Sequence, residues 1–579
     1  MIAGRMQHSR LCGISLVAVL LASLVPGAAL FAQTPSLAQH LPPNAVCYIE
    51  WRGMGFLSGA EKKNHVLQLL EDPDLAPVWV ALASNVEQRN RGQSSSASAI
   101  APLDLLSLLV NPVAFGLVEN EQTSRSSPPG GMTRPGGFFL VYDATGKTDL
   151  IEKWRASRDT HVPAGTEVTH YDFDGTSVEV RPERKNVFYI ARAANYYLMS
   201  DQKQTIEDLV TNFHGAGHSA RSLDQLPEYH EARKFLGPES AIEFFARMPD
   251  LSRWSPPDAK GNVGAELERN LHLERIHVAE GAVSFAGEAT HFRGAVLGDT
   301  SPGGPFDLAA PSSSGFEMQQ IASAGSEFTL SRLNLTATYA FMRAALAASL
   351  PPQKTANLTV FEDLAQGFLG MPVAEALGLF TGEVASVSSY SVDGRPQRMF
   401  AATIQRPEAV LRVLRAVIGP MIASEDYSGS TTYLDISYPY RDSNTGMRRR
   451  RFYYVAVTPQ MILAAPQKAM LRHAVTQLGS QTGPAQASGI FANIDYVQMR
   501  SYLPEKLSGL SGADITQIPW DKLLANLEDR AAKRPQDSHP PDVTWLKLLK
   551  PEVILRHLHM TLTGWWKDPS GVYFDSYLQ

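Results

Sequence analysis

The densest group of residues able to bind a ligand is a run of four arginines, Arg448, Arg449, Arg450 and Arg451. The run opens a predicted strand, so alternate arginines are expected to point to opposite faces of a sheet. Arg441 lies across the predicted turn, and the five cations form a candidate anion-binding patch for a head group or a glycan. The alternative, which we favour on sequence alone, is a solvated strand edge that discourages aggregation.

The histidines and serines give weaker indications. His557 and His559 alternate on a predicted strand and would share a face, which is more typical of a partly exposed surface than of a metal site. The segment 509–513 approaches the Gly-x-Ser-x-Gly pattern of serine hydrolases, but we predict a polar loop there, without a preceding apolar strand. Phosphate-binding and dinucleotide-binding glycine motifs are absent. We therefore expect no catalytic, cofactor-binding or metal-binding residues.

The strands and helices expected to position these residues form a pattern that occurs twice along the chain. Five predicted strand and strand-helix units recur in the same order, which indicates an internal duplication. The matched segments are 41–51 with 321–331, 113–154 with 384–414, 187–209 with 452–478, 241–248 with 490–496, and 273–296 with 555–578.

The spacing of these units predicts the fold class. Short turns join most strand pairs, which favours antiparallel pairing, and helices follow the pairs. The expected fold is α+β: two tandem, similar domains, each a mainly antiparallel sheet with helices packed on one face. We expect the domains at residues 33–299 and 315–579, with a Ser, Gly and Pro-rich linker at 300–314.

The N-terminal segment predicts export. Arg5 and Arg10 precede an apolar run, Pro26-Gly27 breaks it, and small residues follow, so residues 1–32 resemble a signal peptide cleaved after Ala32. An uncleaved N-terminal membrane anchor is the less favoured alternative. The expected location is the periplasm or the extracellular cell surface.

Composition narrows the class further. A chain of 579 residues needs more than one core. The formal net charge is −6, and removal of the two signal arginines makes it about −8, which argues against nucleic acid as a partner. After cleavage Cys47 is the single cysteine, so no intrachain disulfide is expected, and its apolar strand pattern predicts a buried side chain.

The repeated pattern resembles a family of exported bacterial proteins of unknown function. Its members repeat a Leu-Pro-x-x-small-apolar-Tyr-apolar-acid strand, seen here in residues 41–50, and Gly-acid-apolar strand pairs that each feed a helix, as in residues 381–385. The segment 321–331 departs from that pattern because it lacks the Pro-Pro and the acid. The resemblance implies no activity and no functional residue.

Together these observations predict an exported envelope protein that binds or scaffolds without catalysis. Its partner would be an envelope protein, a glycan or an anionic lipid. The alternative is a secreted hydrolase whose site is assembled from residues distant in sequence.

Overall fold

The computed structural model describes most of the chain downstream of the predicted signal. The described residues are 36–57, 63–82, 84, 109–119, 137–159, 167–183, 186–215, 222–237, 240–248, 270–285, 287–310, 312–322, 325–391, 393–441, 447–479, 489–532 and 544–579. The predicted signal peptide and its cleavage site lie outside these residues. Helices and antiparallel strands make up the described part, and this confirms the α+β class.

Within the described residues, twenty antiparallel strands form one continuous sheet, in which the two halves of the chain follow the same order. From its outer edge inward, the first half runs β4 (Thr169–Phe173), β5 (Thr176–Glu183), β6 (Asn186–Ala193), β7 (Tyr196–Ser200), β3 (Gly137–Asp143), β2 (Val113–Val118), β1 (Ala45–Trp51), β8 (Ile242–Arg247), β9 (Ile276–Ser284) and β10 (Thr290–Gly298). The second half runs β15 (Ile422–Ser428), β16 (Thr431–Arg441), β17 (Arg448–Val457), β18 (Met461–Ala465), β14 (Pro396–Ile404), β13 (Phe380–Tyr390), β12 (Glu327–Arg332), β20 (Gly509–Asp514), β21 (Met560–Asp568) and β22 (Gly571–Leu578).

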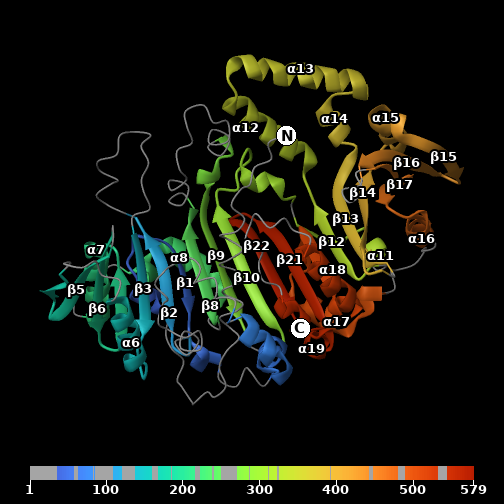
Figure 1. The fold of residues 1–579 in the computed structure, drawn as a ribbon. Helices are drawn as coiled ribbons and strands as arrows, with labels where there is room; N and C mark the ends of the chain where they lie inside the picture. The colour runs from blue at the N-terminus through green and yellow to red at the C-terminus, as the bar shows by residue number, and fades with distance from the viewer. Residues whose placement is uncertain are drawn as a thin grey trace.

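The innermost strands of the two halves pair with each other. β10 and β22 run antiparallel, with Thr290 opposite Leu578 and Leu297 opposite Gly571. Because equivalent strands meet antiparallel, the two halves are related by an approximate two-fold axis at this junction. Figure 1 shows β10 in light green beside β22 in red at the centre of the sheet. The connection at 300–314 contains a short helix (Pro305–Leu308) with Phe306 buried, and Ser313–Ser314 (β11) pairs with Lys506–Leu507 (β19).

Helices lie against both faces of the sheet. In the first half they are α2 (His65–Glu71), α6 (Thr148–Asp159), α7 (Lys203–His214) and α8 (Pro227–Leu236). In the second half the described helices are α11 (Gln319–Ala322), α12 (Leu335–Ser349), α13 (Pro352–Leu369), α14 (Val373–Leu377), α15 (Pro407–Ile418), α16 (Lys468–Gly479), α17 (Ile494–Tyr502), α18 (Trp520–Ala532) and α19 (Pro551–His557), of which α13 stands away from the sheet (Figure 1). On β3, Val141 packs in the core that includes Leu209 of α7, whereas Tyr142 packs in the core that includes Ile151 of α6. Since neighbouring strand residues point to opposite faces, α6 and α7 cover opposite sides.

Glycines opposite aromatic residues recur across the strand pairs. At the central junction a Cβ on Gly294 would lie 1.9 Å from Cζ of Phe574, its cross-strand neighbour. The same relation joins Gly116 with Phe139, Gly281 with Phe244, Gly509 with Trp565 and Gly512 with Phe328. At these positions glycine leaves room for a ring to lie flat over the backbone.

Candidate binding surface of residues 335–479

Helix α13 stands out from the body at the top of Figure 1. Pro352 opens it with the fixed φ that suits a first helical turn, and Gly370 ends it in the left-handed conformation at φ +72°. Its inner face is half-buried, at Thr355, Leu358, Glu362, Ala365 and Leu369. This face packs on α14 and α15.

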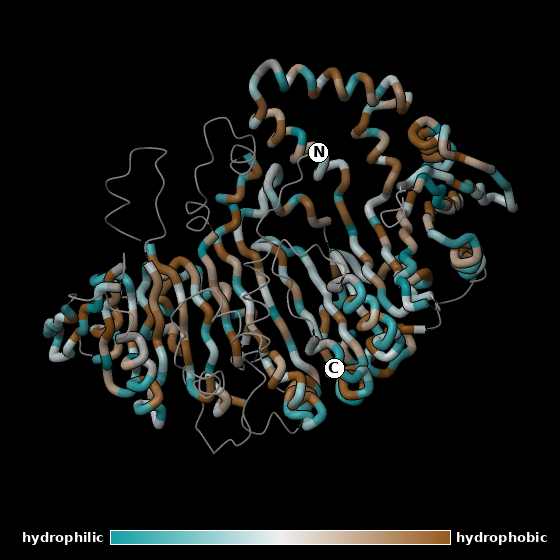
Figure 2. Tube along the Cα trace, in the orientation of Figure 1, coloured by the Kyte–Doolittle hydropathy of each residue, from teal (hydrophilic) through white to brown (hydrophobic). Residues whose placement is uncertain are grey.

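The outer face of α13 is apolar and uncovered in the described structure. Val360 is 55% exposed, Phe361 67%, Leu364 68% and Phe368 63%. At about 100° per residue these four side chains fall within one sector roughly 100° wide. Figure 2 shows the brown, hydrophobic positions along this helix. No helix among the described residues has the length and the apolar character required to cross a bilayer.

An ion pair fixes α13 against α12. The Arg343 guanidinium donates to both carboxylate oxygens of Glu362, at 2.5 and 2.7 Å, and the Tyr339 hydroxyl also donates to Glu362. The guanidinium and the hydroxyl together hold the pKa of Glu362 below its ordinary value. The inner face of α13 therefore has polar as well as apolar partners, and none of the described residues covers its outer apolar face.

The arginine run lies on a two-stranded ribbon that extends beyond the main sheet. β18 pairs with β17 only at residues 454–457, and β15 pairs with β16 only up to Ile436. Beyond these points residues 437–441 of β16 pair only with residues 448–452 of β17. We call residues 437–441 and 448–452 the ribbon. The sequence predicted a strand with arginines alternating between its faces, and the register confirms that arrangement.

The ribbon arginines are exposed on both faces. Arg448, Arg449, Arg450 and Arg451 are all exposed. The Arg451 guanidinium lies over the Tyr440 ring, 4.7 Å from its centroid. The register places Arg441, the fifth cation of the predicted patch, opposite Arg448. Whether these residues bind an anion stays a prediction at this point.

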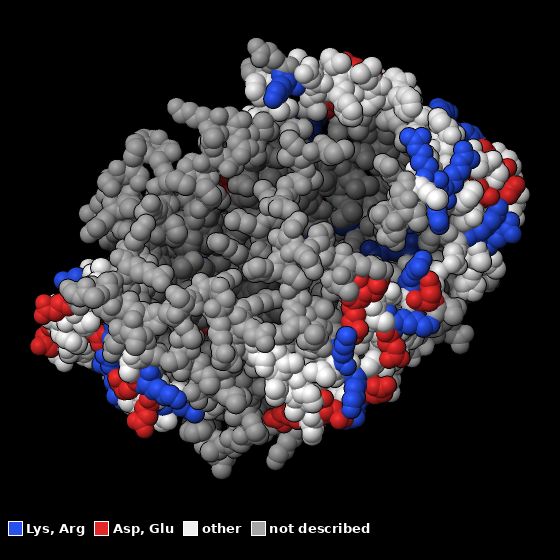
Figure 3. All heavy atoms as spheres, in the orientation of Figure 1, with Lys and Arg blue, Asp and Glu red and all other residues white. Residues whose placement is uncertain are grey.

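Residues 335–479 differ from the rest of the chain in charge and in exposed apolar surface. They hold fourteen Lys or Arg and ten Asp or Glu, although the whole chain has 52 and 58. Of the 21 large hydrophobic residues exposed in the described structure, 11 belong to this quarter of the chain. In Figure 3, Lys and Arg gather at the upper right, where Figure 1 places α15 and β15 to β17.

The two histidines singled out from the sequence do not share a strand face. His557 ends α19, and its Nε2 lies 2.9 Å from the Asp72 carboxylate. His559 precedes β21, 3.8 Å from Asp495. The part of the predicted strand up to His557 is helical, in a helix that Pro551 opens at a position where proline favours helix initiation, and the strand begins only at Met560. Within the described residues no three His, Cys, Asp or Glu side chains group as metal ligands.

Two further predictions are corrected by the strand assignments. The segment Gly509–Asp514, expected as a loop, is strand β20 between β12 and β21, and its glycines accommodate the rings of Trp565 and Phe328. The segment 490–496, matched with β8 from the sequence, forms a short helix and the start of α17. In the sheet β20 occupies the place equivalent to β8.

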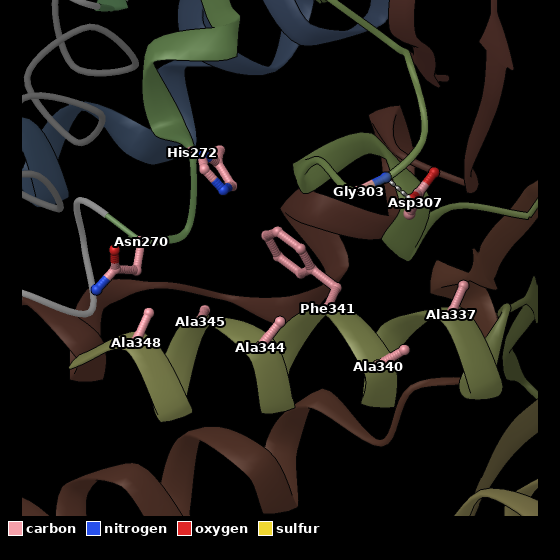
Figure 4. A pocket seen from close by; sticks show the side chains of 10 residues that line it. All are labelled: Asn270, His272, Gly303, Asp307, Ala337, Ala340, Phe341, Ala344, Ala345 and Ala348. Carbon is pink, nitrogen blue, oxygen red and sulfur yellow. Dashed lines mark hydrogen bonds between the residues drawn. The ribbon is translucent and has the colours of Figure 1, made fainter. Parts of the chain in front are cut away.

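Two cavities lie beside this surface. One of about 460 Å³ lies between α12 and the segments at 270–272 and 303–307, and Figure 4 shows the alanines of α12 and Phe341 facing it. Another of about 480 Å³ is polar and is lined by Arg332, Glu383 and Thr403 among others. Arg332 donates to the carbonyls of Ser313 and Leu507 at 3.2 and 3.0 Å, so its guanidinium already has hydrogen-bond partners within the protein.

Three buried carboxyl groups lie side by side in the first half. Glu50 accepts the Leu37 N–H at 3.0 Å, and Glu243 binds Arg52 at 2.5 Å as well as Arg233. Burial, followed by the neighbouring Glu243, raises the pKa of Glu50 to about 7 and that of Glu280 to about 9. Neither Glu50 nor Glu280 lines the two cavities.

Sequence reasoning missed the outer face of α13. The available signal was the i, i+4, i+8 spacing of Val360, Leu364 and Phe368, with Phe361 beside them. Cys47, expected to be buried, is partly buried in β1, and burial raises the pKa of its thiol.

The similarity of this chain to known proteins is weak. The chain matches no protein-family model and no curated protein sequence. Among solved structures it is similar to crystal form III of TP0453, with 10% identity, a TM-score of 0.23, and coverage of 47% of this chain and 82% of the other. Crystal form I of TP0453 gives 9% identity, a TM-score of 0.22, and coverage of 46% and 81%. Similarity at this level does not establish a shared fold.

Proposed function

We propose that this chain is a non-enzymatic protein of the cell envelope that attaches to an anionic membrane surface through residues 335–479. The observation that carries the proposal is the exposed apolar face of α13, within a segment that is positively charged in an otherwise acidic protein. A helix with an exposed apolar stripe can lie in the plane of a bilayer interface and bury that stripe at the boundary between head groups and acyl chains.

The charge of the segment supports an anionic surface over a neutral one. Cations held near a bilayer that contains anionic lipid contribute about 1 kcal/mol each, provided that they lie within a Debye length of the surface. The signal-like sequence at residues 1–32 supports an envelope location. A secreted hydrolase has less support, because Glu50 and Glu280, the carboxyl groups with strongly raised pKa, are enclosed within the fold.

Vesicle sedimentation tests the proposal. The variant Phe361→Ser/Phe368→Ser should weaken binding to phosphatidylglycerol-containing vesicles by at least about tenfold, since each buried phenylalanine contributes about 1.5–3 kcal/mol. Both side chains are more than 60% exposed, so the fold should be unchanged. The matched control is Ile494→Ser/Val497→Ser, two exposed apolar residues of α17, which should bind like the wild type. Equal binding by both variants, or no binding by the wild-type protein, would contradict the proposal.

A further inference from the structure

The arginine ribbon has two chemically different faces. Residues directly opposite each other in an antiparallel pair share a face, so Arg449 and Arg451 lie with Tyr440 and Tyr438. Arg448, Arg450 and Phe452 lie on the other face, where Pro439 stands opposite Arg450. We call these the tyrosine face and the phenylalanine face.

The tyrosine face already has internal partners. The Arg451 guanidinium stacks over Tyr440, and Arg449 is also engaged within the protein. A stacked guanidinium is held in place by the ring, and a new ligand would have to compete with or adapt to that geometry.

On the phenylalanine face Arg448 and Arg450 are open to a ligand, and Arg441 stands opposite Arg448. Arg448 and Arg450 are exposed, and the described residues include no acidic partner for either. Phe452, next on the same face, is 48% exposed. Side chains two residues apart on a strand are about 6.6 Å apart, so two guanidinium groups can approach one phosphate from both sides.

We infer that the phenylalanine face of the ribbon, formed by Arg448, Arg450 and Phe452, is a binding site for the phosphate of a lipid head group. The two guanidinium groups hold the phosphate through charge-assisted hydrogen bonds, and Phe452 contacts the apolar part of the lipid below it. This inference rests on the proposed membrane attachment and assigns the head-group recognition within it.

The test compares two variants of equal charge on full-length mature protein. Arg448→Gln/Arg450→Gln removes two cations of the phenylalanine face and leaves Arg441, and Arg449→Gln/Arg451→Gln removes the two cations of the tyrosine face. Sedimentation with phosphatidylglycerol-containing vesicles should show binding weakened about tenfold or more by the first pair. The second pair leaves the inferred site intact and removes only long-range attraction to the anionic surface, which salt screens, so it should weaken binding clearly less than the first pair.

Each outcome separates the inference from the proposal on which it rests. Equal loss in the two pairs, with wild-type binding intact, would overturn the phosphate site and leave membrane attachment standing. Failure of the wild-type protein to bind any vesicle would overturn both. Inorganic phosphate in the buffer identifies the source of the ligand: the inference expects vesicle binding to persist, and full displacement at millimolar phosphate would overturn the lipid assignment. Thermal melting should show that both variants are folded like the wild type, since all four side chains are exposed.

Discussion

The Asp72 carboxylate lies 2.9 Å from Nε2 of His557, although 485 residues separate them in sequence. Arg556 donates to the same carboxylate at 2.7 Å. Beside them Leu75, Val78 and Val553 form a small apolar core between the first half and α19. The two halves are therefore held together at this contact as well as along the β10 and β22 ladder.

Replacement of Asp72 should weaken this second contact. Asp72→Asn removes a buried charge from two partners and should lower the free energy of unfolding by about 1–3 kcal/mol. His557 holds the pKa of Asp72 below its ordinary value of 3.8, so the contribution is present above that pH and is lost as the pH falls through the lowered pKa. Urea unfolding at neutral pH and near pH 3 measures both effects. Asp74→Asn, whose carboxylate is 43% exposed, should change stability by less than about 0.5 kcal/mol, and an equal loss in both variants would contradict the prediction.

The buried Glu280 carboxyl should make the protein less stable at alkaline pH. Its pKa is raised to about 9 in the folded state, so the unfolded chain releases this proton first, and stability falls as the pH rises from about 4.5 to 9. Glu50, whose pKa is about 7 in the folded protein, is largely ionised between pH 7 and 9 and therefore adds little to the slope of stability against pH in this range. Glu280→Gln should therefore reduce the decline by up to about 1.4 kcal/mol per pH unit, as urea midpoints across this range would show. The control is Glu274→Gln, at an exposed position with a lowered pKa, which should keep the wild-type slope of stability against pH. A wild-type slope in Glu280→Gln as well would contradict the prediction.

A methyl group at Gly294 should loosen the central junction. Because the added Cβ would lie 1.9 Å from the Phe574 ring, Gly294→Ala must displace that ring and should cost about 1–3 kcal/mol. Amide hydrogen exchange measured on β10 and β22 would show whether the loss of stability is located at this junction. Gly367→Ala on α13 is the control: its new Cβ meets nothing within 4 Å, and a helical alanine should stabilise by about 0.5–1 kcal/mol. Protection of β10 equal to that of the wild type would argue against a tight ring contact.

Strands with strong apolar runs could be predicted from the sequence, and strands built around glycine could not. The predicted hairpin at 113–118 and 138–142 is β2 and β3, and the predicted strands near 187–200 are β6 and β7. Strand β20 was predicted as a loop because Gly509 and Gly512 lower strand propensity. The aromatic rings that pack over these glycines come from neighbouring strands far away in sequence, so the local sequence does not reveal them. The internal duplication stays a prediction, which the shared strand order supports.

The candidate surface could be predicted only in part. The arginine run and its alternation were evident, but the faces differ through cross-strand partners such as Tyr440 and Pro439, which only the register of β16 and β17 supplies. The outer stripe of α13 is spaced like any buried helix face. Its exposure depends on where α14 and α15 pack, and no local pattern encodes that.

The pairing of β10 with β22 makes the covalent link between the halves dispensable once the chain has folded. Eight consecutive residue pairs, with Asp72 and its partners, would still join the two pieces if the backbone were cut in the exposed segment at residues 301–303. Nicked protein should consequently migrate as a single particle, and the two fragments should separate only under denaturing conditions.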